Sequence, residues 1–198
     1  MAAEQFDETG RSGMTCDVRN TGNAAPVRED RAAPGRTVVL GLGNTLLGDD
    51  GVGVHAISRL QTDGIECPDV VLLDGGTLSF TLDLAIEGAG QLIVVDAAQL
   101  GREPGAVCVF EGAQMDEFVV TSRKSSVHEV SLADLLAIAM LGGHLPQRRA
   151  LIGIQPKQID WSGKLTAPVE CAVALACDTA RRLICEWRTE GRTEVGES

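Results

Sequence analysis

This sequence of 198 residues lacks an excess of positive charge, a long hydrophobic run and any internal repeat. Its formal net charge is −11 at pH 7, whereas proteins that bind nucleic acids contact the phosphate backbone with Lys and Arg. No apolar run reaches the roughly 20 residues that a membrane-spanning helix requires. The composition therefore argues against a nucleic-acid partner and against a membrane partner.

The sequence also lacks a C-x-x-C pair, although it holds six cysteines. This spacing excludes a zinc ribbon. The first residues carry no apolar stretch of the kind that a secretory signal contains. We therefore expect reduced, buried thiols and a cytoplasmic location. The cysteines are Cys16, Cys67, Cys108, Cys171, Cys177 and Cys185.

The chain divides into three parts by composition. Residues 1–34 are polar and show no apolar periodicity, so we expect a disordered N-terminal extension. Residues 35–188 are long enough to bury an ordinary core and form the single predicted domain. Residues 189–198 form a polar C-terminal tail, which we expect to be frayed.

Within the domain, short apolar runs alternate with segments of helical periodicity. This alternation predicts an α/β fold: a three-layer sandwich with a mostly parallel central sheet and helices on both faces. The segment between residues 110 and 131 is expected to be a polar loop. Strands are predicted at 38–42, 70–73, 92–95, 106–110 and 151–154, and helices at 51–60, 78–86, 131–140 and 169–187.

The turn after the first predicted strand, GLGNTLLGDDGVG from Gly41 to Gly53, is rich in glycine and holds two adjacent carboxylates. It does not fit the dinucleotide pattern G-x-G-x-x-G, because the glycine after Gly43 is Gly48. It does not fit the phosphate-loop pattern either, because Asp49 and Asp50 replace the lysine and the hydroxyl. Two negative charges would repel a phosphate at this helix start. The turn instead indicates a cation site or acid–base chemistry, with one aspartate capping the helix.

Further polar residues follow other predicted strands. Asp74 follows the second strand, Asp96 ends the third, and His128 lies in a loop before a helix. The carboxyl ends of parallel strands share one edge, where ligands bind. Asp74 lies in D-G-G-T, which favours a turn. Asp96 ends an apolar strand, so we expect it to be partly buried and to need a partner. An imidazole and carboxylates from separate loops predict a divalent metal site, or a carboxylate base.

Four further motifs occur in the order found in one known family. They are LDGGT at Leu73–Thr77, VVDA at Val94–Ala97, SVHEVSL at Ser126–Leu132 and IGIQP at Ile152–Pro156. Together with the G-x-G-N-x-L-x-x-D-[DE]-G-x-G turn, they resemble the hydrogenase maturation proteases. The resemblance covers about Val38 to Trp187, which is nearly the whole predicted domain.

The resemblance implies a cytoplasmic endopeptidase that acts on nickel–iron hydrogenases. Such enzymes remove a C-terminal extension from the precursor of the large subunit after nickel has been inserted. The family's metal ligands fall on Asp50, Asp96 and His128. The implied metal is nickel, delivered by the substrate precursor. Many members have glutamate where this chain has Asp50, so the shorter side chain requires a closer backbone, which Gly48 and Gly51 could permit.

The catalytic group stays open at the level of sequence. Neither Ser79 nor Ser125 has a recognisable His–Asp partner, and no cysteine falls in a crevice loop. The metal could polarise the carbonyl, or a carboxylate could act as base. The alternative function is a non-catalytic nickel-binding maturation chaperone with the same ligands. A nucleotide-binding enzyme is disfavoured by the paired aspartates.

Overall fold

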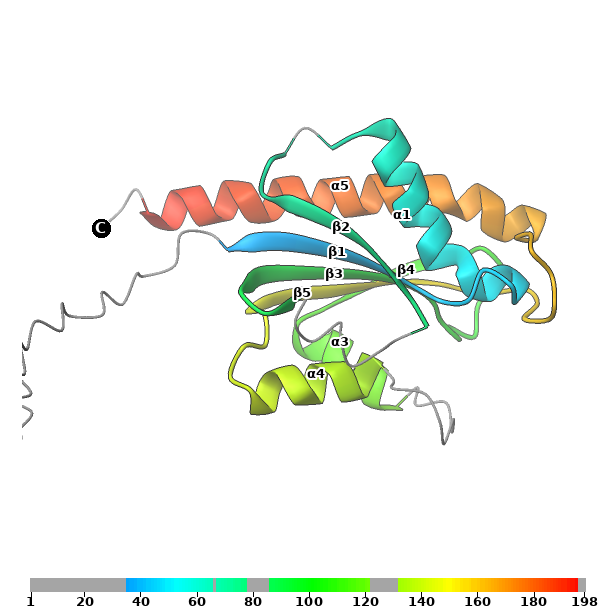
Figure 1. Ribbon diagram of the computed structural model, residues 1–198, viewed down its shortest axis with the longest axis horizontal. Helices are drawn as coiled ribbons and strands as arrows, with labels where there is room; N and C mark the ends of the chain where they lie inside the picture. The colour runs from blue at the N-terminus through cyan, green and yellow to red at the C-terminus, as the bar shows by residue number, and fades with distance from the viewer. Residues whose placement is uncertain (1–34, 66, 78–85, 122–131, 196–198) are drawn as a thin grey trace, which may run out of the picture. The chain divides into compact units, whose positions relative to one another are not determined.

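The computed structural model describes residues 35–65, 67–77, 86–121 and 132–195, which contain a five-stranded sheet (Figure 1). The strand order is β2-β1-β3-β5-β4, and only β4 runs antiparallel to its neighbour. This arrangement confirms the predicted α/β fold with a mostly parallel sheet. The strands are β1 (Arg36–Leu42), β2 (Val70–Gly76), β3 (Ala89–Ala97), β4 (Val107–Glu111) and β5 (Arg148–Ile154).

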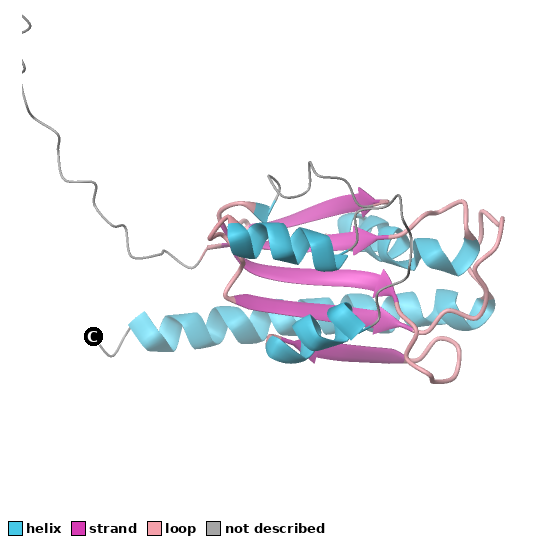
Figure 2. Cartoon of the chain, turned by 90° about the horizontal axis from the view of Figure 1, so that it is seen from below, coloured by secondary structure: helices cyan, strands magenta, loops and turns pink. Residues whose placement is uncertain are grey.

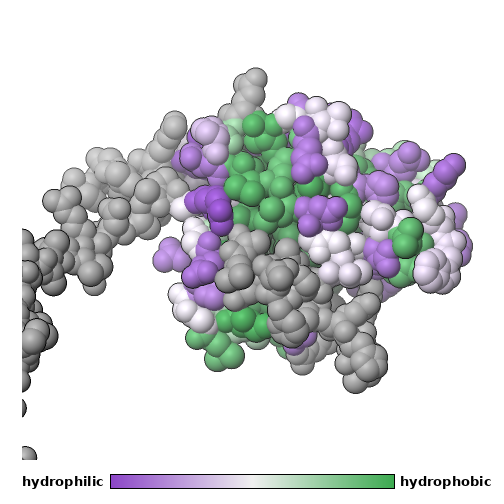
Figure 3. All heavy atoms as spheres, viewed as in Figure 1, coloured by the Kyte–Doolittle hydropathy of each residue, from purple (hydrophilic) through white to green (hydrophobic). Residues whose placement is uncertain are grey.

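Helices cover both faces of the sheet (Figure 2). The alternation of side chains along β1 explains why, since Val39 packs with one cluster while Val38 and Leu40 pack with the other. One cluster includes α1 (Val52–Asp63) and α5 (Ala167–Val195), and the other includes α3 (Ala113–Thr121) and α4 (Leu132–Leu141). The predicted three layers are therefore present. On the face seen in Figure 3, the half-buried edge strand β2 contributes apolar surface.

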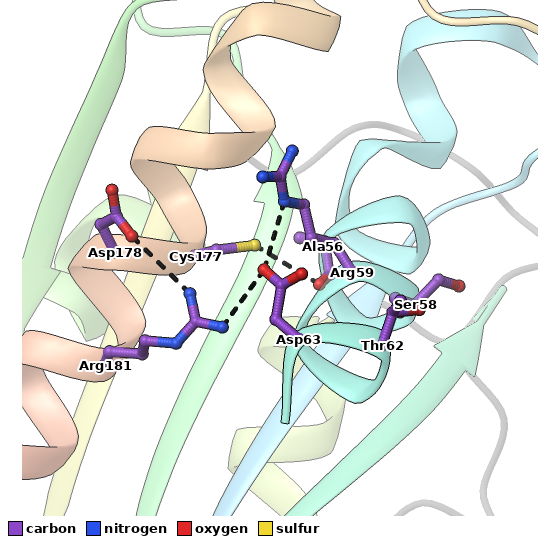
Figure 4. A network of polar contacts seen from close by, with 8 residues as sticks. All are labelled: Ala56, Ser58, Arg59, Thr62, Asp63, Cys177, Asp178 and Arg181. Atoms are coloured by element: carbon purple, nitrogen blue, oxygen red, sulfur yellow. Dashed lines mark hydrogen bonds and ion pairs between the residues drawn. The ribbon is translucent and has the colours of Figure 1, made fainter. Parts of the chain in front are cut away.

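Polar contacts hold the two helices of one layer together (Figure 4). Arg181 on α5 pairs with Asp63 on α1 at 3.3 Å, and Arg59 pairs with the same carboxylate at 3.4 Å. The buried thiol of Cys177 donates to the carbonyl of Ala56 at 3.5 Å. These contacts fix α1, and so the turn that precedes it, against the long helix.

The five described cysteines are all free, as predicted. Cys177 is buried, and burial raises the pKa of its thiol. The expectation of burial is wrong for Cys171 and Cys185, which lie on exposed positions of α5. A helix with one apolar stripe places its other positions in solvent, whatever the residue type.

Helix α3 lies where the sequence predicts a polar loop, so that expectation is wrong. Only Met115 and Val119 of this helix are buried, which leaves too few apolar positions to reveal a period. Its place is fixed by tertiary contact, because the guanidinium of Arg149 on β5 donates to Asp116 at 2.8 Å. This bond also raises the pKa of Arg149 above its ordinary value.

The last helix is longer than the sequence predicts. Helix α5 continues to Val195, so helical structure extends past the boundary at residue 189 and the expected fraying does not begin there. The predicted extension at residues 1–34 and most of the predicted helix at 78–86 lie outside the described residues. No helix within the described residues is long and apolar enough to span a membrane.

Candidate functional site

The sheet changes its winding direction between β1 and β3. From β1 the chain passes through α1 to β2 on one side, whereas β3 pairs on the other side of β1. Such a switch point opens a crevice at the carboxyl ends of the two strands. The turn after β1 and the end of β3 therefore border the place where a ligand would bind.

The turn after β1 folds back on itself, and its glycines allow this. It continues into a short 3₁₀ helix, η1 (Gly48–Gly51), directly before α1. Gly43 has a φ of 120°, and a Cβ there would stand 1.8 Å from the carbonyl oxygen of Asp50. A Cβ at Gly51 would stand 2.6 Å from the Cα of Thr45. Any side chain at either position would open the turn that carries Asp50.

Gly53 brings the start of α1 against both central strands. A Cβ at this residue would stand 2.1 Å from the carbonyl oxygen of Val95 on β3 and 2.4 Å from that of Leu42 on β1. Both atoms belong to rigid backbone, so no flexible side chain could move away. This contact sets the position of η1 over the end of β3.

We expect Gly53→Ala to lower the free energy of unfolding by about 3 kcal/mol, since it places a methyl group inside backbone contact distance. Urea unfolding monitored by circular dichroism measures this change. Gly163→Ala is the matched control, because a Cβ there meets nothing within 4 Å and should change stability by about 0.5 kcal/mol or less. Equal stability of the two variants would contradict the tight packing at Gly53.

Asp50 is half-buried on η1 and helps to shape its own turn. Its Oδ2 accepts a hydrogen bond from the backbone N–H of Asn44 at 2.9 Å. The Asn44 side chain in turn accepts from the N–H of Leu46 at 2.9 Å. The asparagine of the motif therefore closes the turn, and the carboxylate of Asp50 is held at its inner side.

Asp96 is also half-buried, as predicted, and lies within β3 one residue before its end. It is in register with Gly153 of β5, while the preceding Val95 is in register with Gly41 of β1. Because η1 contacts β3, Asp50 and Asp96 border the same switch point from two strands. The two residues therefore lie on elements that are in contact, while their role as metal ligands stays a prediction.

The third predicted ligand, His128, lies outside the described residues, as do Ser79 and Ser125. Within the described ranges, no three His, Cys, Asp or Glu side chains gather into a metal site. The three-ligand site at Asp50, Asp96 and His128 stays a prediction. The chemistry of the set, two carboxylates and an imidazole, suits a divalent transition metal.

Asp49 has a structural role, whereas its neighbour Asp50 is a predicted metal ligand. Asp49 is fully buried, and its carboxylate accepts four hydrogen bonds from a segment far along the chain. The donors are the N–H groups of Lys157 (2.9 Å), Gln158 (3.1 Å) and Thr166 (2.7 Å) and the Thr166 hydroxyl (2.8 Å). The expected helix cap is wrong, because neither η1 nor α1 has a side-chain cap. Asp49 instead anchors the loop between β5 and α5.

The environment of Asp49 favours its charged form. Burial alone would raise the pKa of this carboxyl, but the hydrogen bonds from Thr166, Lys157 and Gln158 together outweigh burial and hold the pKa below its ordinary value of 3.8. The loop therefore depends on an ionised Asp49.

Asp74 has the structural role that the sequence favours. Its exposed carboxylate accepts the N–H of Gly76 at 2.9 Å, which is a local turn contact. Thr77, the last residue of the D-G-G-T segment, directly precedes residues that are not described.

Gln155, directly after β5, has a structural role that the sequence does not reveal. Its side chain is buried and accepts the N–H of Leu100 at 2.8 Å, while its amide donates to Gln99 at 3.1 Å. It therefore orders the loop that follows Asp96. The only sequence signal is its place in the IGIQP motif, directly after a strand.

The fold and the site together define a class: an α/β protein with two carboxylates at the switch point of a mostly parallel sheet. Comparison with known proteins identifies the family. The family model described as hydrogenase maturation protease matches residues 54–183. The hydrogenase expression/formation protein HupD of Rhizobium leguminosarum bv. viciae is 38% identical over 153 residues, covering 77% of this chain and 75% of HupD. The chain therefore belongs to the hydrogenase maturation protease family.

Named enzymes are among the relatives. The hydrogenase 2 maturation protease of Escherichia coli strain K12 is 30% identical over 144 residues, covering 72% of this chain and 87% of that protein. The solved structure of the hydrogenase maturating endopeptidase HybD from E. coli matches with a TM-score of 0.69 at 29% identity, over 79% of this chain and 94% of HybD. The chain is therefore a peptidase, and its predicted family and fold are confirmed.

Proposed function

We propose that this peptidase removes the C-terminal extension from the large-subunit precursor of a nickel–iron hydrogenase, after nickel has been inserted. The observation that carries the proposal is the pair of half-buried carboxylates, Asp50 and Asp96, at the switch point of a family member. The names of the relatives support hydrogenase maturation as the process. The substrate and the cut at its C-terminus follow from the family resemblance.

In this proposal, nickel is carried by the substrate and is recognised by Asp50, Asp96 and His128. Oxygen and imidazole donors suit this metal. Nickel held there would act as a Lewis acid on the scissile carbonyl or on a water molecule. The chain's own contribution is to position two carboxylates, one held by the N–H of Asn44 and one on the rigid centre of the sheet. A carboxylate acting as base is the competing arrangement.

We further propose that the reaction takes place in the cytoplasm on a precursor that has not yet assembled with its small subunit. A net charge of −11 offers no excess of cations for nucleic acid. No helix among the described residues could span a membrane. The partner in this proposal is the large-subunit precursor, which the names of the relatives support.

We expect the purified full chain to shorten nickel-loaded precursor and to leave nickel-free precursor intact. Gel mobility and intact mass of the precursor measure the cut, and a chelator added before mixing should prevent it. Zinc-loaded precursor is the control for specificity toward nickel. Binding of the loaded precursor without any loss of mass would instead favour the non-catalytic chaperone and would refute the proposed activity.

A further inference from the structure

Three large apolar side chains are exposed beside the candidate site. Leu46 is 59% exposed, Ile159 is 39% exposed and Trp161 is 82% exposed. We call these three residues the apolar patch. The other tryptophan, Trp187, is only 5% exposed and packs in the core. A single exposed apolar residue would need no explanation, but three on neighbouring segments indicate a contact surface.

The two segments that carry the patch are joined by backbone hydrogen bonds. The N–H of Ser162 donates to the carbonyl of Leu46 at 3.0 Å, and the N–H of Gly48 donates to the carbonyl of Ser162 at 2.6 Å. Leu47 and Ser162 also form a parallel bridge. Leu46 accepts one of these bonds, and Trp161 directly precedes the donor Ser162, so the two residues are neighbours in space although they are far apart in sequence.

The patch is held in place before any partner arrives. Asp49 anchors both sides of the loop, through Lys157 and Gln158 before Trp161 and through Thr166 after it. The backbone that carries Trp161 is thus already ordered, so binding a partner there would require little additional ordering.

The patch is continuous with the turn that bears Asp50. Leu46 lies four positions before Asp50, and the N–H of Asp50 donates to the carbonyl of Leu47 at 3.3 Å. A protein that reaches Asp50 with its metal-bearing segment would therefore lie against the patch. At the end of the molecule toward which the parallel strands point, apolar surface lies among polar side chains (Figure 3).

The charges around the patch also point to a partner. Lys157 and Lys164 flank Ile159 and Trp161 and are exposed, and neither forms an ion pair with a described residue. The intervening Asp160 accepts a hydrogen bond from the side chain of Gln158. In a chain of net charge −11, this loop therefore carries two cations and one carboxylate beside apolar surface, an excess of one positive charge. It is complementary to an apolar segment with acidic neighbours.

We propose that the apolar patch binds an apolar segment of the hydrogenase large-subunit precursor, flanked by acidic residues, while the substrate's metal lies at Asp50. This inference rests on the proposed function. Trp161 is the central contact, because a large, pre-positioned aromatic side chain carries a disproportionate share of binding energy at an interface. The patch contributes affinity and selects the substrate, and it takes no part in cleavage.

The test compares the wild type with Trp161→Ala and the control Leu175→Ala, which removes a 55% exposed leucine of α5 outside the patch. Processing rates are measured against the concentration of nickel-loaded precursor, and binding is measured separately by biolayer interferometry. Trp161→Ala should raise the half-saturating concentration and the Kd by about 30-fold, with the maximal rate unchanged. Leu175→Ala should match the wild type. Trp161→Phe should recover most of the affinity, and urea midpoints verify that each variant is folded.

The outcomes separate the two proposals. Wild-type processing with unchanged half-saturation in Trp161→Ala overturns the docking role and leaves the protease function standing. Binding that depends on Trp161 without any cleavage by the wild type overturns the function and supports the docking. If the wild type shows no binding and no cleavage, both proposals are overturned. Concentration-dependent dimers of the wild type that Trp161→Ala abolishes would assign the patch to a second copy of this chain instead.

Discussion

Asp96→Asn is expected to reduce processing of nickel-loaded precursor by about a hundredfold or more while the protein remains folded. The substitution keeps the size of the side chain and removes its charge. A metal ligand or a general base needs that charge, and even residues that only orient metal ligands can contribute 10–100-fold. Since β3 pairs through its backbone on both sides, stability should change by about 1 kcal/mol or less. Intact mass of the precursor over time measures the rate.

Asp69→Asn is the matched control for this variant. Asp69 is exposed and directly precedes β2, at the opposite end of the strands from the site. The Asp69→Asn variant should process the precursor at the wild-type rate. If Asp96→Asn also kept the wild-type rate, Asp96 could be neither a ligand nor the base.

Asp49→Ala should lower the free energy of unfolding by about 3–4 kcal/mol. The substitution removes the acceptor of four hydrogen bonds and leaves three backbone N–H groups and one hydroxyl without it. Urea unfolding at neutral pH measures the loss. Asp160→Ala is the control in the same loop, because Asp160 is exposed, and it should change stability by about 0.5 kcal/mol or less. A loss of similar size in both variants would contradict the anchoring role of Asp49.

The stabilisation by Asp49 should also depend on pH. Its pKa in the folded protein lies below the ordinary value of 3.8, so the unfolded chain binds the proton more readily. The contribution is therefore complete above the ordinary value and is lost as the pH falls through the lower, folded value. Between about pH 5 and about pH 3, the wild type should lose more stability than Asp49→Ala does. Parallel pH curves would show that the carboxylate is not held in its charged form.

The strands of the parallel sheet could be predicted because each is a short apolar run bounded by turn residues. Val38–Leu40 and Leu92–Val95 are buried on both faces, and this requires continuous apolar sequence. The direction of β4 could not be predicted in this way. Its sequence, VCVFE, is equally compatible with either direction, and pairing with β5 decides it. Helix α3 could not be predicted because its few buried apolar residues show no clear periodicity. Its position is fixed by the ion pair between Asp116 and Arg149.

The site was partly predictable for a similar reason. Asp50 and Asp96 follow or end strands, and the geometry of a parallel sheet brings such positions together. The sequence also shows that two adjacent aspartates differ in role, but it does not show what Asp49 binds. Its donors belong mainly to backbone groups between Lys157 and Thr166, and any residue type supplies a backbone N–H. A partner of this kind leaves no signature in the sequence.

The bond between Asp49 and Thr166 also bears on how the enzyme is made. These residues are 117 positions apart, so the turn near the beginning of the domain depends on a loop near its end. A ribosome synthesises Asp50 and Asp96 long before Thr166, and contacts between distant residues form late in folding. The growing chain thus holds both carboxylates before it holds the loop that fixes the turn bearing Asp50. We expect the candidate site to reach its final structure only when translation of the domain is almost complete.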